Sequence, residues 1–196
     1  MEKSVKVAIS NRHVHLTKEI YDQLFDDDYK IINNLNQPNE FVTDKVVTIK
    51  NGDNEIKNVK LLGPFRNYNQ VEIAFSDALK LNVKPPVRKS SDLRDAALIT
   101  IETEKGKVTL PCCIIAQRHI HIDKVSAEKL NIKDGQSVFV KVGKEKKGII
   151  ECFFKITEDG YYELHIDKDD ACAFLLNNDD DAYFDLGSLS NSVGRQ

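Results

Sequence analysis

The chain has 196 residues, of which 41% are hydrophobic and 30% charged, and its formal net charge is −3. This length can bury one large or two small cores, and the balance of charge gives no reason to expect a nucleic-acid or membrane partner. No apolar run approaches the ~20 residues that span a bilayer, and Met1 to Val5 lead into a strand-like segment without the apolar core of a signal peptide. The four cysteines lack metal-binding or disulfide-framework spacing, so we expect all four to be reduced and buried in a cytoplasmic protein.

In the first half of the chain, short apolar runs alternate with turn formers. We expect a strand over residues 4–16 and then a short helix from Lys18 to about Phe25, capped by Thr17. Residues 29–43 predict a loop with a small hairpin. Strands over 45–50 and 56–62 form a hairpin around the turn at 51–54, and a strand over 70–75 precedes a short helix over 76–81.

The second half repeats this alternation. Strands are expected over 97–102, 107–116, 137–142, 147–156 and 161–166, with one short helix from Lys124 to Leu130 that Asp123 caps. The polar tail from Asn177 is expected to be frayed. Many short strands with few helices indicate barrels or sandwiches. We predict a mainly β fold of two related small β-barrel domains with short capping α-helices, formed by an internal duplication.

The duplication is clearest in two histidine-containing stretches, Arg12-His13-Val14-His15-Leu16 and Arg118-His119-Ile120-His121-Ile122, which use four of the five histidines. Residues two apart on a strand share a face and lie ~6.5–7 Å apart, so each pair can converge on one metal ion at ~2.0–2.1 Å. A single pair of this kind is more often a surface or core feature, but two copies with matching flanks predict metal sites. The preceding arginines point away from the histidines and are expected to support the fold.

Two histidines do not fill a coordination sphere, so each pair needs a third ligand. His165 is the only spare histidine and is expected to complete one site. Glu72, between Val71 and Ile73, is the best strand carboxylate for the other, because an unpaired charge there would be costly to bury. Arg66 follows a Gly-Pro break and is either a phosphate-binding arginine or a solvated loop arginine; its position alone leaves both open.

These segments together resemble the PduL-type phosphate acyltransferases, the phosphate propanoyltransferase family. The resemblance runs from about residue 5 to residue 174, with the motifs in order at Ser10–Leu16, Leu61–Pro64, Gln70–Ile73, Pro85–Arg88, Arg118–His121 and Leu164–Asp167.

The resemblance implies a zinc-dependent phosphate acyltransferase that exchanges a short acyl group between coenzyme A and inorganic phosphate: propanoyl-CoA or acetyl-CoA plus phosphate gives acyl phosphate plus CoA. It implies two zinc ions between two barrels and a homodimer. His13, His15 and Glu72 would hold the zinc near the CoA sulfur, His119, His121 and His165 the second zinc, and Arg66 would engage phosphate. The barrels would be interwoven, with residues 1–11 and 117–185 in one, residues 12–116 in the other, and 186–196 as a tail.

The chain departs from the family pattern in places. Residues 89–95 lack the glycine usual there, and only nine residues precede the first motif, so we expect a free cytoplasmic enzyme without a microcompartment-targeting extension. Two other functions fit the residues alone: a binuclear zinc hydrolase of esters or phosphoesters, and a non-catalytic metal-binding β-domain with closed four-coordinate sites. Acyl chain length is left open, because one methylene changes binding by only ~1–3 kcal/mol.

Overall fold

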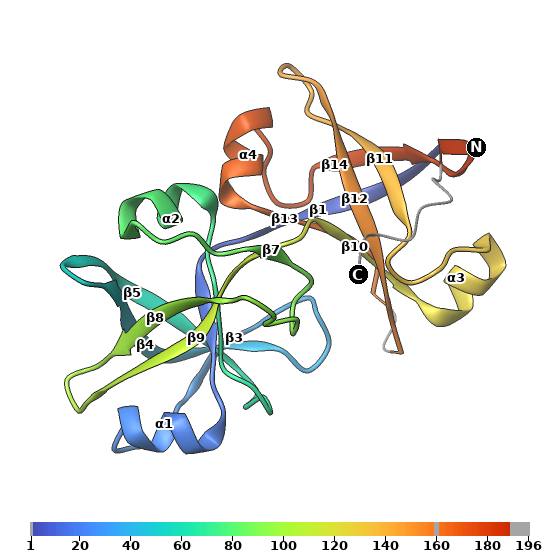
Figure 1. Ribbon diagram of the computed structural model, residues 1–196. Coiled ribbons are helices and arrows are strands. Elements are labelled where there is room, and N and C mark those ends of the chain that lie inside the picture. Colours follow the sequence, from blue (N-terminus) through green and yellow to red (C-terminus); the bar gives the residue numbers. More distant parts are fainter. Residues whose placement is uncertain (1, 159–160, 189–196) are drawn as a thin grey trace. The chain divides into compact units, whose positions relative to one another are not determined.

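The computed structural model describes residues 2–158 and 161–188, which fold into two mainly β units (Figure 1). One unit contains residues 2–10 with 117–158 and 161–188, and the other contains residues 11–116. The elements in chain order are β1 (Glu2–Ser10), β2 (His13–His15), α1 (Lys18–Leu24), β3 (Ile31–Asn34), β4 (Phe41–Asn51), β5 (Asn54–Gly63), β6 (Gln70–Glu72), α2 (Phe75–Leu81), β7 (Val87–Arg88), β8 (Ala97–Glu102), β9 (Lys107–Ala116), β10 (His119–Asp123), α3 (Lys124–Leu130), β11 (Ser137–Val142), β12 (Gly148–Thr157), β13 (Glu163–Asp167), α4 (Lys168–Phe174), β14 (Asp181–Asp185) and the 3-10 turn Leu186–Ser188.

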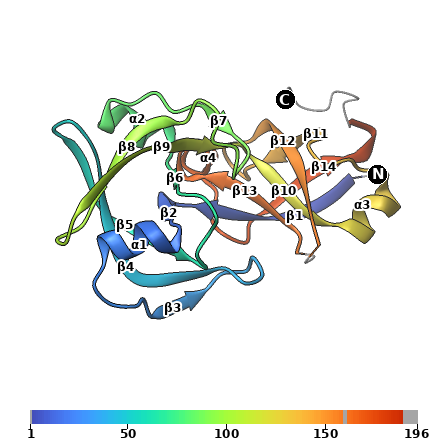
Figure 2. The same cartoon turned by 60° about the horizontal axis from the view of Figure 1, so that its bottom comes forward.

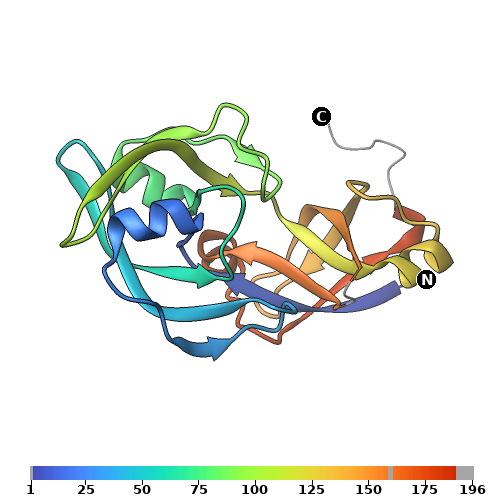
Figure 3. The ribbon, with the colours of Figure 1, turned by 90° about the horizontal axis from the view of Figure 1, so that it is seen from below.

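The first unit is a closed barrel with the strand order β1-β13-β10-β12-β11-β14, which we call the His-rich barrel because it holds three histidines. Strand β10 runs antiparallel to β13 and parallel to β12, and β1 lies parallel beside β13 (Figure 3). The core consists of inward-facing aliphatic and aromatic residues, the largest of which are Phe154 and Phe184. Each large apolar side chain buried in such a core contributes about 1.5–3 kcal/mol.

The second unit is also a six-stranded barrel, called here the Glu72 barrel. Its strands β4, β5, β2, β6 and β9 are neighbours in that order, and β8 closes the ring by pairing with both β9 and β4. Figure 2 shows β2 between β5 and β6, as the pairing requires. Strands β3 and β7 extend this sheet from β4 and β9. Two barrels with short helices confirm the predicted fold class.

The two barrels have the same strand order and directions, so the predicted duplication extends to the topology. In each barrel the strand with the histidine pair runs parallel to one neighbour and antiparallel to another. The strand before each pair belongs to the other barrel: β1 leads into β2 but pairs in the His-rich barrel, and β9 leads into β10 but pairs in the Glu72 barrel. Each sequence repeat therefore contributes its first strand to the barrel of the other repeat.

The helices follow the same duplication, and two of their caps were predicted. The side chain of Thr17 accepts a hydrogen bond from the Ile20 N–H at the start of α1, and Asp123 accepts one from the Ser126 N–H at the start of α3. Figure 1 shows α1 and α2 at opposite ends of the Glu72 barrel. Helices α2 and α3 end at asparagines with positive φ, a conformation that asparagine tolerates well.

Several local expectations were wrong. The expected strand over 4–16 is interrupted at residues 11–12, because its two parts pair in different barrels. Helix α4 was not predicted, because its acidic first turn shows little amphipathic pattern. Acidic residues are nevertheless favourable at a helix N-terminus, where they face the positive end of the helix dipole. The tail expected from Asn177 contains β14, whose Ala182 and Phe184 are buried; residues 189–196 lie outside the described part.

Three of the four cysteines are buried, as expected. Cys112, Cys113 and Cys152 are buried and free, but Cys172 on α4 is exposed, so the expectation that all four are buried was wrong. Residues of a short surface helix can face solvent even where the sequence alone favours burial. Among the described residues, no helix has the length and hydrophobicity of a transmembrane span.

Candidate metal centre

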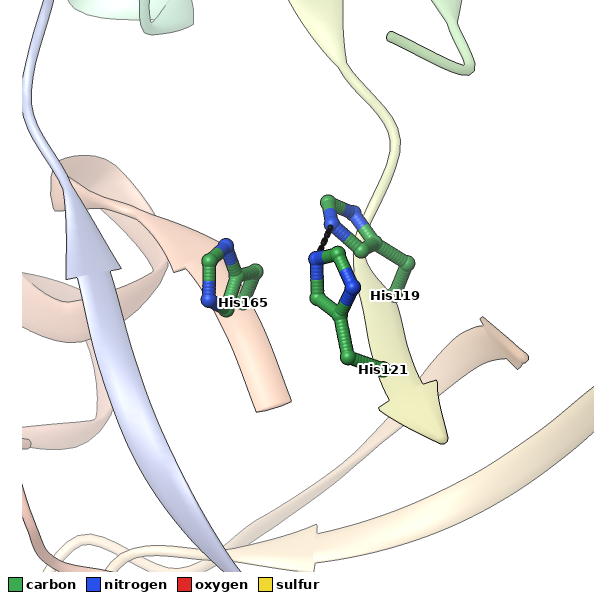
Figure 4. Close-up of side chains that lie close together, drawn as sticks. All are labelled: His119, His121 and His165. Carbon is green, nitrogen blue, oxygen red and sulfur yellow. Dashed lines mark hydrogen bonds between the residues drawn. The ribbon is translucent and has the colours of Figure 1, made fainter. Parts of the chain in front are cut away.

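Three histidines converge on one side of two paired strands of the His-rich barrel (Figure 4). Strand β10 supplies His119 and His121, and β13 supplies His165, which lies directly across from His119 in the antiparallel register. One possible ligand atom from each residue lies within 4.8 Å of the others, and this is the only such cluster of histidine, cysteine or carboxylate groups found in residues 2–158 and 161–188. We call these three residues the His trio.

Hydrogen bonds and burial leave the imidazoles in forms that suit a metal ion. Nδ1 of His119 lies 2.8 Å from the carbonyl oxygen of Gln117 and donates to it, which leaves the Nε2 lone pair available. The Nε2 atoms of His119 and His121 lie 3.0 Å apart and share a hydrogen bond, which a metal ion bound to both nitrogens would replace. A tetrahedral metal at ~2.0–2.1 Å from both atoms would separate them by about 3.3 Å, so the trio fits a metal with little movement.

The electrostatics of His121 agree with this fit. Burial lowers the pKa of His121 far below that of a free imidazole, and the neighbouring His119 and His165 lower it further. The ring is therefore neutral, as a metal ligand must be. Its Nδ1 is buried and has no hydrogen-bond partner within the described part of the chain.

The Glu72 barrel holds the second predicted group, His13, His15 and Glu72, at the equivalent position. His13 lies across from Glu72 in the β2–β6 register, as His119 lies across from His165. Nδ1 of His13 lies 2.8 Å from the carbonyl oxygen of Asn11, and its Nε2 lies 3.7 Å from Glu72 Oε2. The rings of His13 and His15 are nearly perpendicular, with 5.0 Å between their centroids. The three residues are neighbours but are less tightly gathered than the His trio.

The Glu72 carboxylate is held by polar neighbours that sequence reasoning missed. Its Oε1 accepts hydrogen bonds from Gln70 Nε2 at 2.5 Å and from Ser90 Oγ at 3.0 Å. Gln70 Oε1 in turn accepts from the backbone N–H of Ser91, which has a φ of +79°. Ser91, in the segment that lacks the usual glycine, therefore has a left-handed conformation in which its N–H is bound by Gln70. Because these bonds occupy Oε1, they leave Oε2 directed toward His13.

The two repeated arginines form ion pairs with the helices that follow the predicted third ligands, Glu72 and His165. Arg12 pairs with Asp77 on α2, and Arg118 forms two hydrogen bonds of 2.7 Å with Asp170 on α4. Both aspartates are the third residue of their helix. These contacts agree with the expectation that the arginines support the fold rather than bind a ligand.

Arg66 lies in the segment between β5 and β6, after the cis Gly63–Pro64 peptide. Its guanidinium is paired with Glu40, which also accepts a hydrogen bond from Gln37 at 2.6 Å. Arg66 Nε is buried and has no hydrogen-bond partner among the described residues. The side chain is therefore ion-paired and only 28% exposed, and its buried Nε is an unused donor.

Comparison with known proteins decides the family. The family model described as phosphate propanoyltransferase matches residues 6–177. The chain belongs to the phosphate propanoyltransferase family. It is 40% identical to the phosphate propanoyltransferase of Alkaliphilus metalliredigens, over 86% of this chain and 82% of that protein, and 38% identical to that of Thermotoga maritima, over 93% and 89%. The Rhodopseudomonas palustris protein of the same name is 36% identical over 90% of this chain and 80% of its own length.

Membership of the phosphate propanoyltransferase family makes the chain an acyltransferase and confirms the resemblance stated from the motifs. Sequence reasoning found the His trio but missed the polar residues around the third ligands. One signal was present: a tyrosine stands four residues before each predicted third ligand, Tyr68 before Glu72 and Tyr161 before His165. Tyr68 is hydrogen-bonded to Ser90, and burial raises its pKa. The hydroxyl of Tyr161 lies 2.7 Å from His165 Nε2.

Proposed function

We propose that this protein exchanges a short acyl group, acetyl or propanoyl, between coenzyme A and inorganic phosphate. A phosphate oxygen forms a bond to the thioester carbonyl carbon while the carbon–sulfur bond breaks, so that acyl phosphate and CoA are produced. The proposal is supported by the preorganised His trio in a chain of the phosphate propanoyltransferase family.

We propose that the His trio and the group of His13, His15 and Glu72 each hold one zinc ion. Bound zinc would polarise the thioester carbonyl and stabilise the departing thiolate, which are its usual contributions as a Lewis acid. The residues of the chain orient these groups: the backbone carbonyls of Asn11 and Gln117 fix the rings of His13 and His119. This arrangement costs no reorganisation during the reaction.

Arg66 is proposed to bind the phosphate. Its guanidinium offers a fork of donors that matches phosphate oxygens, and the buried Nε has no partner among the described residues. A phosphate at this position would satisfy that donor. Glu40 would then hold the other part of the guanidinium and fix its direction.

The test is release of CoA thiol from acetyl-, propanoyl- and butanoyl-CoA, with and without phosphate. The proposal expects thiol release and acyl phosphate only when phosphate is present, and loss of both in His119→Ala. Free acid formed equally without phosphate would instead identify a zinc hydrolase. A folded, zinc-loaded protein that turns over none of the three thioesters would identify a non-catalytic metal-binding domain.

We also propose that two copies form a homodimer. Phe75 and Leu79, one turn apart on α2, are 60% and 66% exposed, and an apolar face of this kind is typical of an interface. Light scattering after size exclusion should give twice the chain mass for the wild type and a smaller value for Leu79→Asp. A monomeric wild type at assay concentration would reject the dimer.

A further inference from the structure

The hydroxyl of Tyr161 and the carboxylate of Glu163 both lie at the same nitrogen of His165. Tyr161 Oη is 2.7 Å and Glu163 Oε2 is 3.5 Å from His165 Nε2. The Tyr161 ring also packs on the His121 ring with 4.5 Å between centroids and 34° between planes. Tyr161 therefore contacts two members of the His trio through different parts of its side chain.

The other ring nitrogen of His165, Nδ1, differs from Nε2 in its contacts. No hydrogen bond to Nδ1 is formed within the described part of the chain, and the side chain is only 17% exposed. A neutral imidazole carries one N–H and one lone pair. Two oxygens at Nε2 favour the N–H there, because a carboxylate accepts and cannot donate when ionised. The lone pair is then on Nδ1.

A metal-binding histidine usually donates its second ring N–H to a carboxylate, carbonyl or similar acceptor, which fixes its tautomer and orientation. His119 follows this rule with its Nδ1–H on the Gln117 carbonyl and Nε2 as the ligand atom. We propose that His165 follows it in the reverse sense: Tyr161 and Glu163 hold its Nε2–H, and Nδ1 is its ligand atom. Tyr161 and Glu163 are thus positioning residues for the metal of the His trio.

The duplicated half supports this assignment. Glu72 occupies the position of His165, and Gln70 occupies that of Glu163, two residues earlier on the strand. Gln70 bonds to Oε1 of Glu72, the oxygen that does not face His13. In both barrels the residue two positions before the third ligand contacts the atom of that ligand that is not used for metal.

The inference rests on the proposed metal-binding role of the trio, and its first test reads the nitrogen directly. Full-length protein labelled with nitrogen-15 and loaded with zinc is examined by long-range proton–nitrogen correlation of the imidazoles, with His165→Ala used to assign the signal. We expect zinc on Nε2 of His119 and His121 and on Nδ1 of His165, which keeps a proton on Nε2. Zinc on Nε2 of His165 would overturn the proposal.

The second test measures metal affinity by competition with a chelator, using Co²⁺ absorption as the signal and His13→Ala as background so that the trio alone is measured. Loss of an outer hydrogen-bond partner typically lowers metal affinity about 10- to 100-fold, and we expect a loss in this range for Tyr161→Phe, which keeps the ring on His121. Tyr162→Phe, the adjacent tyrosine, is the matched control and should bind as the background does. Equal or tighter binding by Tyr161→Phe would show that the hydroxyl only packs or competes with metal.

Failure of the positioning role can be distinguished from failure of the proposed acyltransferase function. If zinc binds Nε2 of His165 while phosphate-dependent thiol release is intact, the positioning role fails and the transferase stands. If the trio binds no metal in the wild type, the positioning role fails together with the zinc dependence. The thiol-release assay then reports on acyl transfer by itself.

Discussion

Replacing Arg66 should separate the loss of activity from the loss of stability. In Arg66→Ala the pair with Glu40 disappears, and Glu40, only 11% exposed, keeps Gln37 as its partner. A hydrogen bond to a charged group contributes ~1.5–3 kcal/mol. The same substitution removes a buried Nε donor that is unsatisfied among the described residues and costs ~1–3 kcal/mol. These terms oppose each other, so the net loss of stability should be no more than about 2 kcal/mol.

The effect on catalysis should be much larger. Removal of one well-placed donor to a developing or bound oxyanion lowers the rate by about 10²–10³, and we expect a fall of this size in kcat/KM for phosphate. Arg66→Lys keeps the charge but loses the fork, so its activity should lie between those of the wild type and Arg66→Ala.

The assay follows CoA thiol release at varied phosphate concentration, with thermal unfolding of each variant measured in parallel. Arg94→Ala is the matched control, because it removes an exposed arginine that is also paired with a carboxylate, Asp92; its phosphate dependence should be that of the wild type. If Arg66→Ala folds and its kcat/KM for phosphate stays within about threefold of wild type, the reasoning from donor geometry is refuted.

Three further predictions concern the ligands, the ion pairs and the thiols. Glu72→Gln keeps the shape of the side chain but removes its charge, so metal analysis should find one ion fewer per chain with the His trio still loaded. Arg12→Met should lower the free energy of unfolding by ~2–3 kcal/mol and Arg118→Met by ~1–2 kcal/mol. The loss is smaller for Arg118 because its side chain is 41% exposed and its partner Asp170 is less buried than Asp77, the partner of Arg12. Equal losses in urea denaturation would contradict this order. Iodoacetamide near pH 8 should label the native chain once, at Cys172, because burial raises the pKa of Cys113 to about 12 and keeps it as a thiol; a label retained in Cys172→Ser would disprove it.

Most of the fold could be predicted because strand periodicity and the repeated stretch are local signals. The caps at Thr17 and Asp123 were readable for the same reason, since the capping side chain and the N–H that it accepts from are three residues apart. The break at residues 11–12 was not readable from periodicity. Alternation of apolar and polar residues predicts that a segment is a strand, but it does not predict which barrel supplies the neighbouring strands.

The His trio could be predicted because its members are rare residues at a spacing that a strand converts into a shared face. The residues that orient it could not be predicted in this way. Tyr161 lies outside β13, and the strand periodicity that places His165 does not show that the Tyr161 hydroxyl lies 2.7 Å from its Nε2. Glu40 lies 26 residues from Arg66 in the chain, so their pairing depends on how the β3–β4 hairpin packs.

The difference between the two proposed metal groups follows from the chemistry of the predicted third ligand. A carboxylate accepts hydrogen bonds, and Glu72 is accordingly surrounded by donors, with Gln70 two residues before it. A neutral imidazole that binds metal has one N–H to donate, and in our proposal His165 directs it toward Tyr161 and toward Glu163, two residues before it. The side chain two positions before the predicted third ligand thus changes from an amide to a carboxylate when that ligand changes from a carboxylate to an imidazole. A duplicated fold can hold the two unlike metal sites that we propose, because the exchange of Glu72 for His165 is matched by the exchange of Gln70 for Glu163 beside it.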